Sequence, residues 1–342
     1  MSVITVIPGD GIGPEVVPEA LETLAVLGLP LAVDVLDHVN ADRFLRTGET
    51  LTDEEFARVR DSSGVLFGAV GDPRVRSGEY ARGVLLRLRL ELDLYVNHRP
   101  ARLLHERVSP LRRAGSREID CVIVRENTEG LYTGIGGRLR VGTPDEIAMD
   151  TDTSTYLGVS RVIDYAFGIA RRGVCMVDKS NAVRFGGALW QRCWTEAVAQ
   201  HPDVPVSHLY VDAAAMKLVS DPTQFDVIVT NNSYGDILSD IAAEVAGGIG
   251  CAASANLNLA TGFGLYEPVH GSAPDIVGRG IANPFGAISS LALLLARLGY
   301  QAEADAVDKA VAAAVAAERC TADMGGTLTT RQAGAAVRAL IG

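Results

Sequence analysis

The sequence has few aromatic residues and few cysteines. Aromatic side chains account for 6% of the 342 residues, and the five cysteines stand far apart along the chain. An odd number of widely spaced cysteines fits neither a disulfide framework nor a zinc site, so we expect free or buried thiols in a reducing compartment. This predicts a cytoplasmic location.

Long apolar runs and a stripe of basic residues are also missing. The longest apolar stretch, near residues 291–296, is far shorter than a bilayer requires, and the first residues lack the basic region of a signal peptide. Asp and Glu outnumber Lys and Arg by 42 to 31, which gives a formal net charge of −11. We therefore expect no membrane and no nucleic acid among the partners.

The chain does have the composition of a globular protein, with 48% hydrophobic and 21% charged residues. At 342 residues, two domains or one large α/β body is expected. Short β-branched runs alternate with segments of helical character, which favours an α/β fold with a largely parallel sheet. The strand-like runs are residues 3–7, 64–69, 121–124, 174–177 and 227–230.

A glycine-rich turn follows the first predicted strand. Residues 9–13 are Gly-Asp-Gly-Ile-Gly, with Pro14 next, so the spacing departs from the G-x-G-x-x-G fingerprint of Rossmann dinucleotide sites. Taken alone, these glycines fit a tight structural turn as well as a ligand-binding loop.

Three arginines are candidates for holding an anionic substrate. Arg89 and Arg99 stand ten residues apart, and Arg125 directly follows a predicted strand. Guanidinium groups donate two parallel hydrogen bonds to a carboxylate, so three converging arginines would suit a di- or tricarboxylate. From spacing alone, solvated surface arginines are the commoner explanation. The place of Arg125 at the end of a strand favours a site.

Two aspartates stand one helical turn apart at Asp236 and Asp240. Like charges at this spacing lower stability unless a cation lies between them. Oxygen ligands suit Mg²⁺ or Mn²⁺, and Asp212, after another strand-like run, is a candidate third ligand. A helix whose acidic residues face water is the commoner alternative.

Lys179 and Tyr132 are candidate proton carriers. Lys179 follows a predicted strand, and Tyr132 lies seven residues after Arg125. Either side chain can transfer protons if its surroundings shift its pKa, and either could equally be an ordinary surface residue. His270 lies in a loop rich in Gly and Pro, where a lone histidine is usually structural or solvated.

Taken together, these segments resemble the decarboxylating β-hydroxyacid dehydrogenases, the isopropylmalate and isocitrate dehydrogenase family. Five motifs occur in the family's order across nearly the whole chain, which is far more specific than any one of them. The motifs are residues 7–15 (IPGDGIGPE), 89–100, 125–130 (RENTEG), 235–240 (GDILSD) and 267–275 (EPVHGSAPD).

The resemblance implies a two-domain α/β fold that is not a Rossmann fold. Residues 1–97 and 247–342 would form a discontinuous first domain that binds the cofactor. Residues 98–246 would form a second domain for substrate, metal and the dimer interface. The chain would be a homodimer with shared active sites, because Lys179 and Asp212 are expected to reach the site of the partner subunit.

The implied reaction is the NAD-dependent oxidation and decarboxylation of a small 2-hydroxy acid that carries a carboxylate at C3. Arg89, Arg99 and Arg125 would hold the carboxylates. Lys179 would assist removal of the hydroxyl proton, and Tyr132 would help protonate the enol carbon. A Mg²⁺ or Mn²⁺ ion would polarise the C2 oxygen and stabilise the enolate. Its ligands would be Asp212, Asp236 and Asp240.

The same resemblance assigns residues to the cofactor. The carboxylate of Asp275 can accept hydrogen bonds from both ribose hydroxyls and would repel a 2′-phosphate, so NAD is expected. Relatives that use NADP carry Lys-Tyr in place of Asp275-Ile276. The cofactor-binding residues would be Ile12, His270, Gly271, Ser272, Ala273, Asp275 and Asn283.

Leu85 and Leu86 would form an apolar wall for the third substituent of the substrate. Isocitrate enzymes place Ser and Asn where this chain has Gly83 and Leu85, and homoisocitrate enzymes have Arg in place of Leu86. Burial of an isopropyl group here would contribute roughly 1.5–3 kcal/mol, so we expect 3-isopropylmalate and leucine biosynthesis. D-malate and tartrate enzymes keep both leucines, so these acids, homoisocitrate or a specialised pathway stay open.

A regulatory subunit that binds nucleotide without turnover is the alternative from a different class. It predicts damage to the residues of the chemistry, whereas all of the candidates are intact. We therefore expect a catalytically competent enzyme. The intact candidates are Arg89, Arg99, Arg125, Tyr132, Lys179, Asp212, Asp236 and Asp240.

Overall fold

The computed structural model describes residues 2–76, 78–112 and 119–341. The chain divides into two units, and both are discontinuous in sequence. Strands and helices alternate in each unit, which confirms the predicted α/β class. Unit 1 contains Met1–Leu94, Arg99–Ile119 and Ala243–Gly342, and unit 2 contains Tyr95–His98 and Asp120–Ala242.

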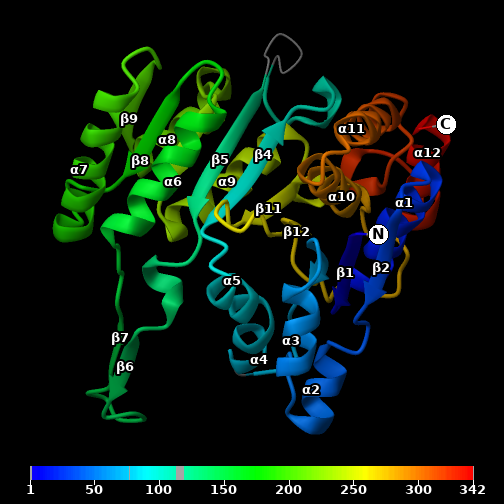
Figure 1. Ribbon diagram of the computed structural model, residues 1–342, viewed down its shortest axis with the longest axis horizontal. Coiled ribbons are helices and arrows are strands. Elements are labelled where there is room, and N and C mark those ends of the chain that lie inside the picture. The colour runs from blue at the N-terminus through cyan, green and yellow to red at the C-terminus, as the bar shows by residue number, and fades with distance from the viewer. Residues whose placement is uncertain (1, 77, 113–118, 342) are drawn as a thin grey trace. The chain divides into compact units, whose positions relative to one another are not determined.

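A sheet with the strand order β2-β1-β3-β12-β11 forms the centre of unit 1 (Figure 1). Neighbouring strands are parallel except β11 and β12, which are antiparallel. Strands β3, β11 and β12 are buried throughout, as expected for strands covered on both faces. The strands are β1 (Ser2–Gly9), β2 (Leu31–Val35), β3 (Val65–Ala69), β11 (Ala253–Leu257) and β12 (Gly264–Pro268).

Helices complete the core of unit 1. Helix α10 contacts β11, β12 and α11, and α1 contacts α12. The helices are α1 (Gly13–Leu27), α2 (Ala41–Thr47), α3 (Asp53–Arg60), α4 (Glu79–Ala81), α5 (Arg87–Glu91), α10 (Phe285–Arg297), α11 (Gln301–Ala316) and α12 (Thr330–Ile341). A π-helical turn, Arg82–Leu86, stands between α4 and α5. Short 3-10 turns occur at Glu106–Val108, Ile249–Cys251 and Ala322–Met324.

Unit 2 is built on a parallel sheet with the order β5-β10-β8-β9. Its strands are β5 (Asp120–Glu126), β8 (Val174–Asp178), β9 (Val206–Tyr210) and β10 (Val227–Thr230). Its helices are α6 (Tyr156–Ile169), α7 (Arg184–Gln200), α8 (Val211–Ser220) and α9 (Asn232–Ala246), with 3-10 turns at Gly130–Thr133 and Pro222–Gln224. All five predicted strands are thus present, as β1, β3, β5, β8 and β10.

An antiparallel hairpin of β6 (Gly136–Leu139) and β7 (Ile147–Asp150) belongs to unit 2 but not to its sheet. The hairpin extends away from the sheet and helices of its own unit (Figure 1). All residues of both strands are exposed, so these strands bury no side chain against the rest of the chain that the structure describes.

The chain passes between the units along β4 (Val96–Arg102). The prediction assigned residues 98–246 to the second domain, whereas the structure groups Arg99–Ile119 with unit 1. Hydrogen bonds explain this grouping. Arg107 donates to the carbonyl oxygens of Met324 at 2.6 Å and Val315 at 3.1 Å.

Within the described residues, no helix is both long and apolar enough to cross a membrane.

Candidate functional site

Arg125 is the second-last residue of β5, which ends at Glu126. Several of the predicted site residues lie around it. Its guanidinium is almost fully buried. The Nη1 atom donates to Asp236 Oδ1 at 2.5 Å, and Nε and Nη2 donate to Asn232 Oδ1 at 2.9 and 2.7 Å. The Tyr132 hydroxyl lies 3.3 Å from Asp236 Oδ2. The structure therefore brings Arg125, Tyr132 and Asp236 together.

A glycine makes this close approach possible. A Cβ atom at Gly235 would lie 2.6 Å from Cβ of Arg125, closer than any side chain allows. Helix α9 can therefore lie against the end of β5 only because position 235 has no side chain. The guanidinium of Arg125 also lies 5.6 Å from the ring centre of Tyr132, within range of a cation–π interaction.

Asp236 and Asp240 lie one turn apart on α9, as predicted. Asp236 is half-buried beside Arg125, and Asp240 is exposed. The third predicted metal ligand, Asp212, is elsewhere, in the first turn of α8. In the part of the chain that the structure describes, no group of three or more His, Cys, Asp or Glu residues could hold a metal ion. One chain thus presents at most two of the three aspartates together.

Lys179 and Asp212 form a second group in unit 2. Lys179 follows β8, and its Nζ atom lies 2.5 Å from Asp212 Oδ1. The hydrogen bond from Lys179 lowers the pKa of the Asp212 carboxyl below its usual value. The side chains are 27% and 66% exposed, so solvent screens the pair and it adds little to stability. Both groups remain accessible to a further molecule.

Arg89 is buried in unit 1, where Nη2 donates to Glu267 Oε1 at 2.7 Å. Asn256 Nδ2 donates to the same oxygen at 2.8 Å. The Nε atom of Arg89 is buried and has no hydrogen-bond partner among the described residues. The sequence assigned no role to Glu267, although it opens the motif of residues 267–275. Arg99, the remaining predicted arginine, is buried on β4.

The predicted cofactor loop lies against the glycine turn. Ile12 N donates to the carbonyl oxygen of Ser272 at 3.0 Å. Gly11 has φ +58°, and a Cβ atom there would lie 2.0 Å from that same oxygen. Gly11 is therefore needed both for the turn and for the close approach. A cavity of about 350 Å³ is lined by Gly11 and Pro274, among others.

His270 is buried in this loop, and burial lowers its pKa so that the ring is neutral near pH 7. Its Nδ1 atom lies 2.9 Å from the Gly271 carbonyl oxygen, and its Nε2 atom has no partner among the described residues. Ala273 adopts φ +40°, a conformation that few residues other than glycine adopt. Asp275 is exposed.

Asn283 has a structural role that the sequence did not indicate. Its side-chain nitrogen donates to Asp323 Oδ2 at 2.9 Å, and its side-chain oxygen accepts from Phe285 N at 3.0 Å. The second contact satisfies a backbone N–H in the first turn of α10.

Asp10 was also missed, because it was read only as a member of the glycine turn. It is buried, and its carboxylate accepts from Ala41 N at 2.7 Å, Gly71 N at 2.8 Å and the Tyr80 hydroxyl at 2.8 Å. An acidic residue directly after a buried strand was the available signal. Asp10 holds three separate segments of unit 1 together.

The chain was compared with known proteins. A family model described as isocitrate/isopropylmalate dehydrogenase matches residues 3–337. The chain belongs to the isocitrate/isopropylmalate dehydrogenase family. The 3-isopropylmalate dehydrogenase of Leifsonia xyli subsp. xyli is 48% identical over 98% of this chain and 97% of its own length. The 3-isopropylmalate dehydrogenase of Streptomyces coelicolor is 46% identical over 97% of this chain and 98% of its own length.

Solved structures of isocitrate/isopropylmalate dehydrogenase relatives share the fold. An isocitrate dehydrogenase from Methylococcus capsulatus has a TM-score of 0.91 at 34% identity and covers 100% of this chain and 99% of its own. A β-decarboxylating dehydrogenase from Thermococcus kodakarensis has a TM-score of 0.81 at 36% identity, with 100% and 96% covered. The chain is a decarboxylating dehydrogenase that resembles 3-isopropylmalate dehydrogenase, which confirms the predicted enzyme and sets aside the regulatory subunit.

Proposed function

We propose that this chain oxidises and decarboxylates 3-isopropylmalate to 4-methyl-2-oxopentanoate, a step of leucine biosynthesis, with NAD⁺ and Mg²⁺ or Mn²⁺. The observation that carries the proposal is the contact group of Arg125, Tyr132 and Asp236, which brings together a guanidinium, a phenol and a carboxylate that could serve these three roles. Relatives named 3-isopropylmalate dehydrogenase, 46–50% identical over nearly the full chain, support the substrate.

The residues of the predicted cofactor loop fit NAD. His270 is neutral and keeps a buried ring nitrogen without a protein partner in the described chain, so it can bond to a ligand. The exposed carboxylate of Asp275 suits a ribose with two free hydroxyls and disfavours a 2′-phosphate. The residues that would hold the cofactor are Ile12, His270, Gly271, Ser272, Ala273, Asp275 and Asn283.

The predicted metal ligands fit a hard divalent cation, since all three are carboxylates. Asp236 and Asp240 would come from one chain and Asp212 from the other, in agreement with the two aspartates that α9 presents together. When bound, NAD⁺ would accept the hydride from C2, and the cation would withdraw electron density from the C2 oxygen.

The remaining steps belong to side chains of this protein. Arg89, Arg99 and Arg125 would bind the carboxylates of the substrate and orient C2. Lys179 would assist removal of the proton of the C2 hydroxyl as hydride leaves. After the C3 carboxylate departs as CO₂, the Tyr132 hydroxyl would deliver a proton to C3. In sum, a hydride leaves C2 and a proton leaves the C2 oxygen. CO₂ leaves C3, and a proton takes its place on C3.

A homodimer with shared sites is part of the proposal. Unit 2 exposes large apolar side chains that burial against a second copy would remove from water. They include Phe185 on α7, Met216 and Val219 on α8, Ile237 on α9, and Leu139 and Met149 on the hairpin. In the same unit Asp212 is exposed and Lys179 is partly exposed, and both would reach the partner's site. A cytoplasmic location stays a prediction.

The test is NAD⁺ reduction measured in parallel with 3-isopropylmalate, D-malate, tartrate, isocitrate and homoisocitrate, with and without Mg²⁺ or Mn²⁺. We expect the highest kcat/KM with 3-isopropylmalate, and activity only with the cation present. A higher kcat/KM with another acid would reassign the substrate. A higher kcat/KM with NADP⁺ than with NAD⁺ would contradict the role of Asp275.

A further inference from the structure

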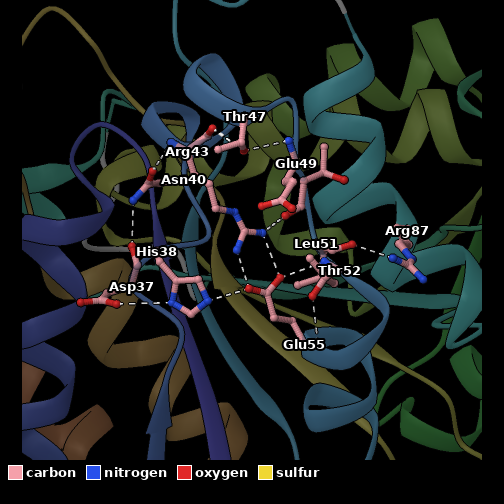
Figure 2. Close-up of polar contacts among 11 residues, drawn as sticks. Asp37, His38, Asn40, Arg43, Thr47, Glu49, Leu51, Thr52, Glu55 and Arg87 are labelled. Carbon is pink, nitrogen blue, oxygen red and sulfur yellow. Dashed lines mark hydrogen bonds and ion pairs between the residues drawn. The ribbon is translucent and has the colours of Figure 1, made fainter.

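A network of buried hydrogen bonds joins α2 and α3 in unit 1 (Figure 2). Arg43 and Glu55 are both buried. Arg43 donates from Nη2 to Glu55 Oε2 at 2.9 Å and from Nη1 to Oε1. His38 Nε2 lies 2.6 Å from Glu55 Oε1, and Thr52 N donates to Oε2 at 2.8 Å. Both oxygens of the carboxylate are therefore fully engaged.

The charge of Glu55 is maintained by these partners. Burial alone would raise its pKa, but the hydrogen bonds from Arg43, Thr52 and His38 outweigh burial and lower the pKa to about 2. Glu55 is therefore ionised near neutral pH. Because this ion pair is buried and both carboxylate oxygens accept hydrogen bonds, it holds α2 and α3 in one geometry.

The network continues into the segment between α2 and α3. Arg43 also donates to the carbonyl oxygen of Thr50. The next residue, Leu51, accepts at its carbonyl oxygen from Arg87 Nη1 at 2.6 Å, and its N–H points to the Gly83 carbonyl oxygen at 3.4 Å. The segment of Thr50 and Leu51 is thus held by α2 on one side and by the π-helical turn and α5 on the other.

Gly83 lies in the π-helical turn Arg82–Leu86, which also carries Leu85 and Leu86. A Cβ atom at Gly83 would lie 2.5–2.7 Å from side-chain atoms of Thr50, so the two residues are already in close contact. A shift of Thr50 toward the turn would therefore press on Gly83. π-Helical turns are rare and occur frequently at functional sites.

We propose that Arg43 and Glu55 are positioning residues for the apolar substrate wall. They fix Thr50 against Gly83, and this contact sets the place of Leu85 and Leu86, on which preference for an alkyl substituent at C3 depends. The inference rests on the proposed function, because it concerns the same substrate site. It assigns specificity to residues that do not touch the substrate.

The test compares 3-isopropylmalate with D-malate, which lacks the isopropyl group, in Glu55→Gln and Gly83→Ala. For both variants we expect KM for 3-isopropylmalate to rise about 10-fold with kcat retained, since a displaced apolar wall weakens binding of the alkyl group by this order. For D-malate, kcat/KM should change less than about twofold. Adding Thr50→Gly to Gly83→Ala removes all three clashing atoms, Oγ1, Cγ2 and Cβ, and should restore a low KM.

Arg58→Ala is the matched control, because it deletes another arginine–carboxylate pair of α3, the exposed pair with Asp34, and should leave both substrates unaffected. If Glu55→Gln does not fold, the Gly83 variants decide the outcome. Equal losses for both acids, no loss, or no rescue by Thr50→Gly would overturn the inference. If wild-type enzyme itself prefers D-malate, the proposed function fails, and the positioning role fails with it.

Discussion

Arg43 and Glu55 in unit 1 are buried, and every oxygen of the carboxylate is engaged by a neighbour. Lys179 and Asp212 in unit 2 are partly exposed and are joined by one hydrogen bond. The first pair fixes position, because breaking it would leave a buried charge without its partner. The second pair contributes little to folding and is available for chemistry. A buried pair whose oxygens are all hydrogen-bonded thus serves to fix position, whereas a partly exposed pair with one hydrogen bond is available for chemistry.

Arg125 and Asp236 fall between these extremes. The guanidinium is buried and bonded to Asn232, as in the first pair, whereas the carboxylate is half-exposed and lies beside Tyr132, as in a reactive group. Changes at the three pairs should consequently affect activity and stability in different proportions.

The largest effect on activity is expected for Lys179→Met. Loss of a group that transfers a proton typically reduces kcat about 10²–10⁴-fold. The melting temperature should be unchanged, because the pair with Asp212 is exposed. Steady-state kinetics and thermal unfolding measure both quantities. Lys309→Met, on the exposed surface of α11, is the control and should keep full activity. A Lys179 variant with normal kcat would remove this residue from the reaction.

A smaller loss of activity is expected for Arg125→Ala, together with a lower melting temperature. Loss of a charged hydrogen bond to the substrate costs about 1.5–3 kcal/mol in kcat/KM, or roughly 10- to 150-fold. Stability falls as well, since Asp236 loses its buried partner. Arg60→Ala, which breaks the exposed pair with Asp61, is the control and should alter neither. Unchanged kcat/KM in the Arg125 variant would place it outside the site.

The sequence could predict the strands but not how they pair. Each β-branched run between turn residues is a local signal, so β1, β3, β5, β8 and β10 were found. The antiparallel pairing of β11 with β12 inside a parallel sheet was not predicted, because it depends on contacts across the whole unit. Likewise, nothing in the local pattern indicated that Arg107 ties residues 99–119 to unit 1.

The identities of the site residues could be predicted, because five motifs resemble those of one family. The contacts between these residues could not be predicted. Arg125 and Asp236 are 111 residues apart, so spacing alone could not show that they touch. Asp10 and Glu267 lie within quoted motifs, yet their bonds to distant backbone and to Arg89 appear only in three dimensions. The roles of the predicted site residues in catalysis stay predictions.

The last prediction concerns the pH dependence of stability and no change in activity. The pKa of Glu55 is about 2 in the folded chain against an ordinary value of 4.5. The unfolded chain therefore binds more protons between these values, so the stabilisation is complete above about pH 5 and is lost as pH falls toward about 2. The melting temperature of wild type should approach that of Glu55→Gln as pH falls through this window.

Asp212→Asn is the comparison for this measurement. The pKa of Asp212 is lowered by Lys179, which has the same sign of effect, but the carboxylate is exposed and screened by solvent. Thermal unfolding between pH 3 and 7 should therefore give the same curve for this variant and for wild type. A larger pH effect at Asp212 than at Glu55 would reverse the contrast between the two pairs.

Complementation tests most directly whether one active site draws residues from two chains. Lys179→Met and Asp236→Asn should each be nearly inactive alone. When the two variants are co-expressed and pair at random, half of the dimers contain one complete site, so about a quarter of wild-type activity should return. A mixture as inactive as its components would show that each chain builds its own site, and would contradict the account.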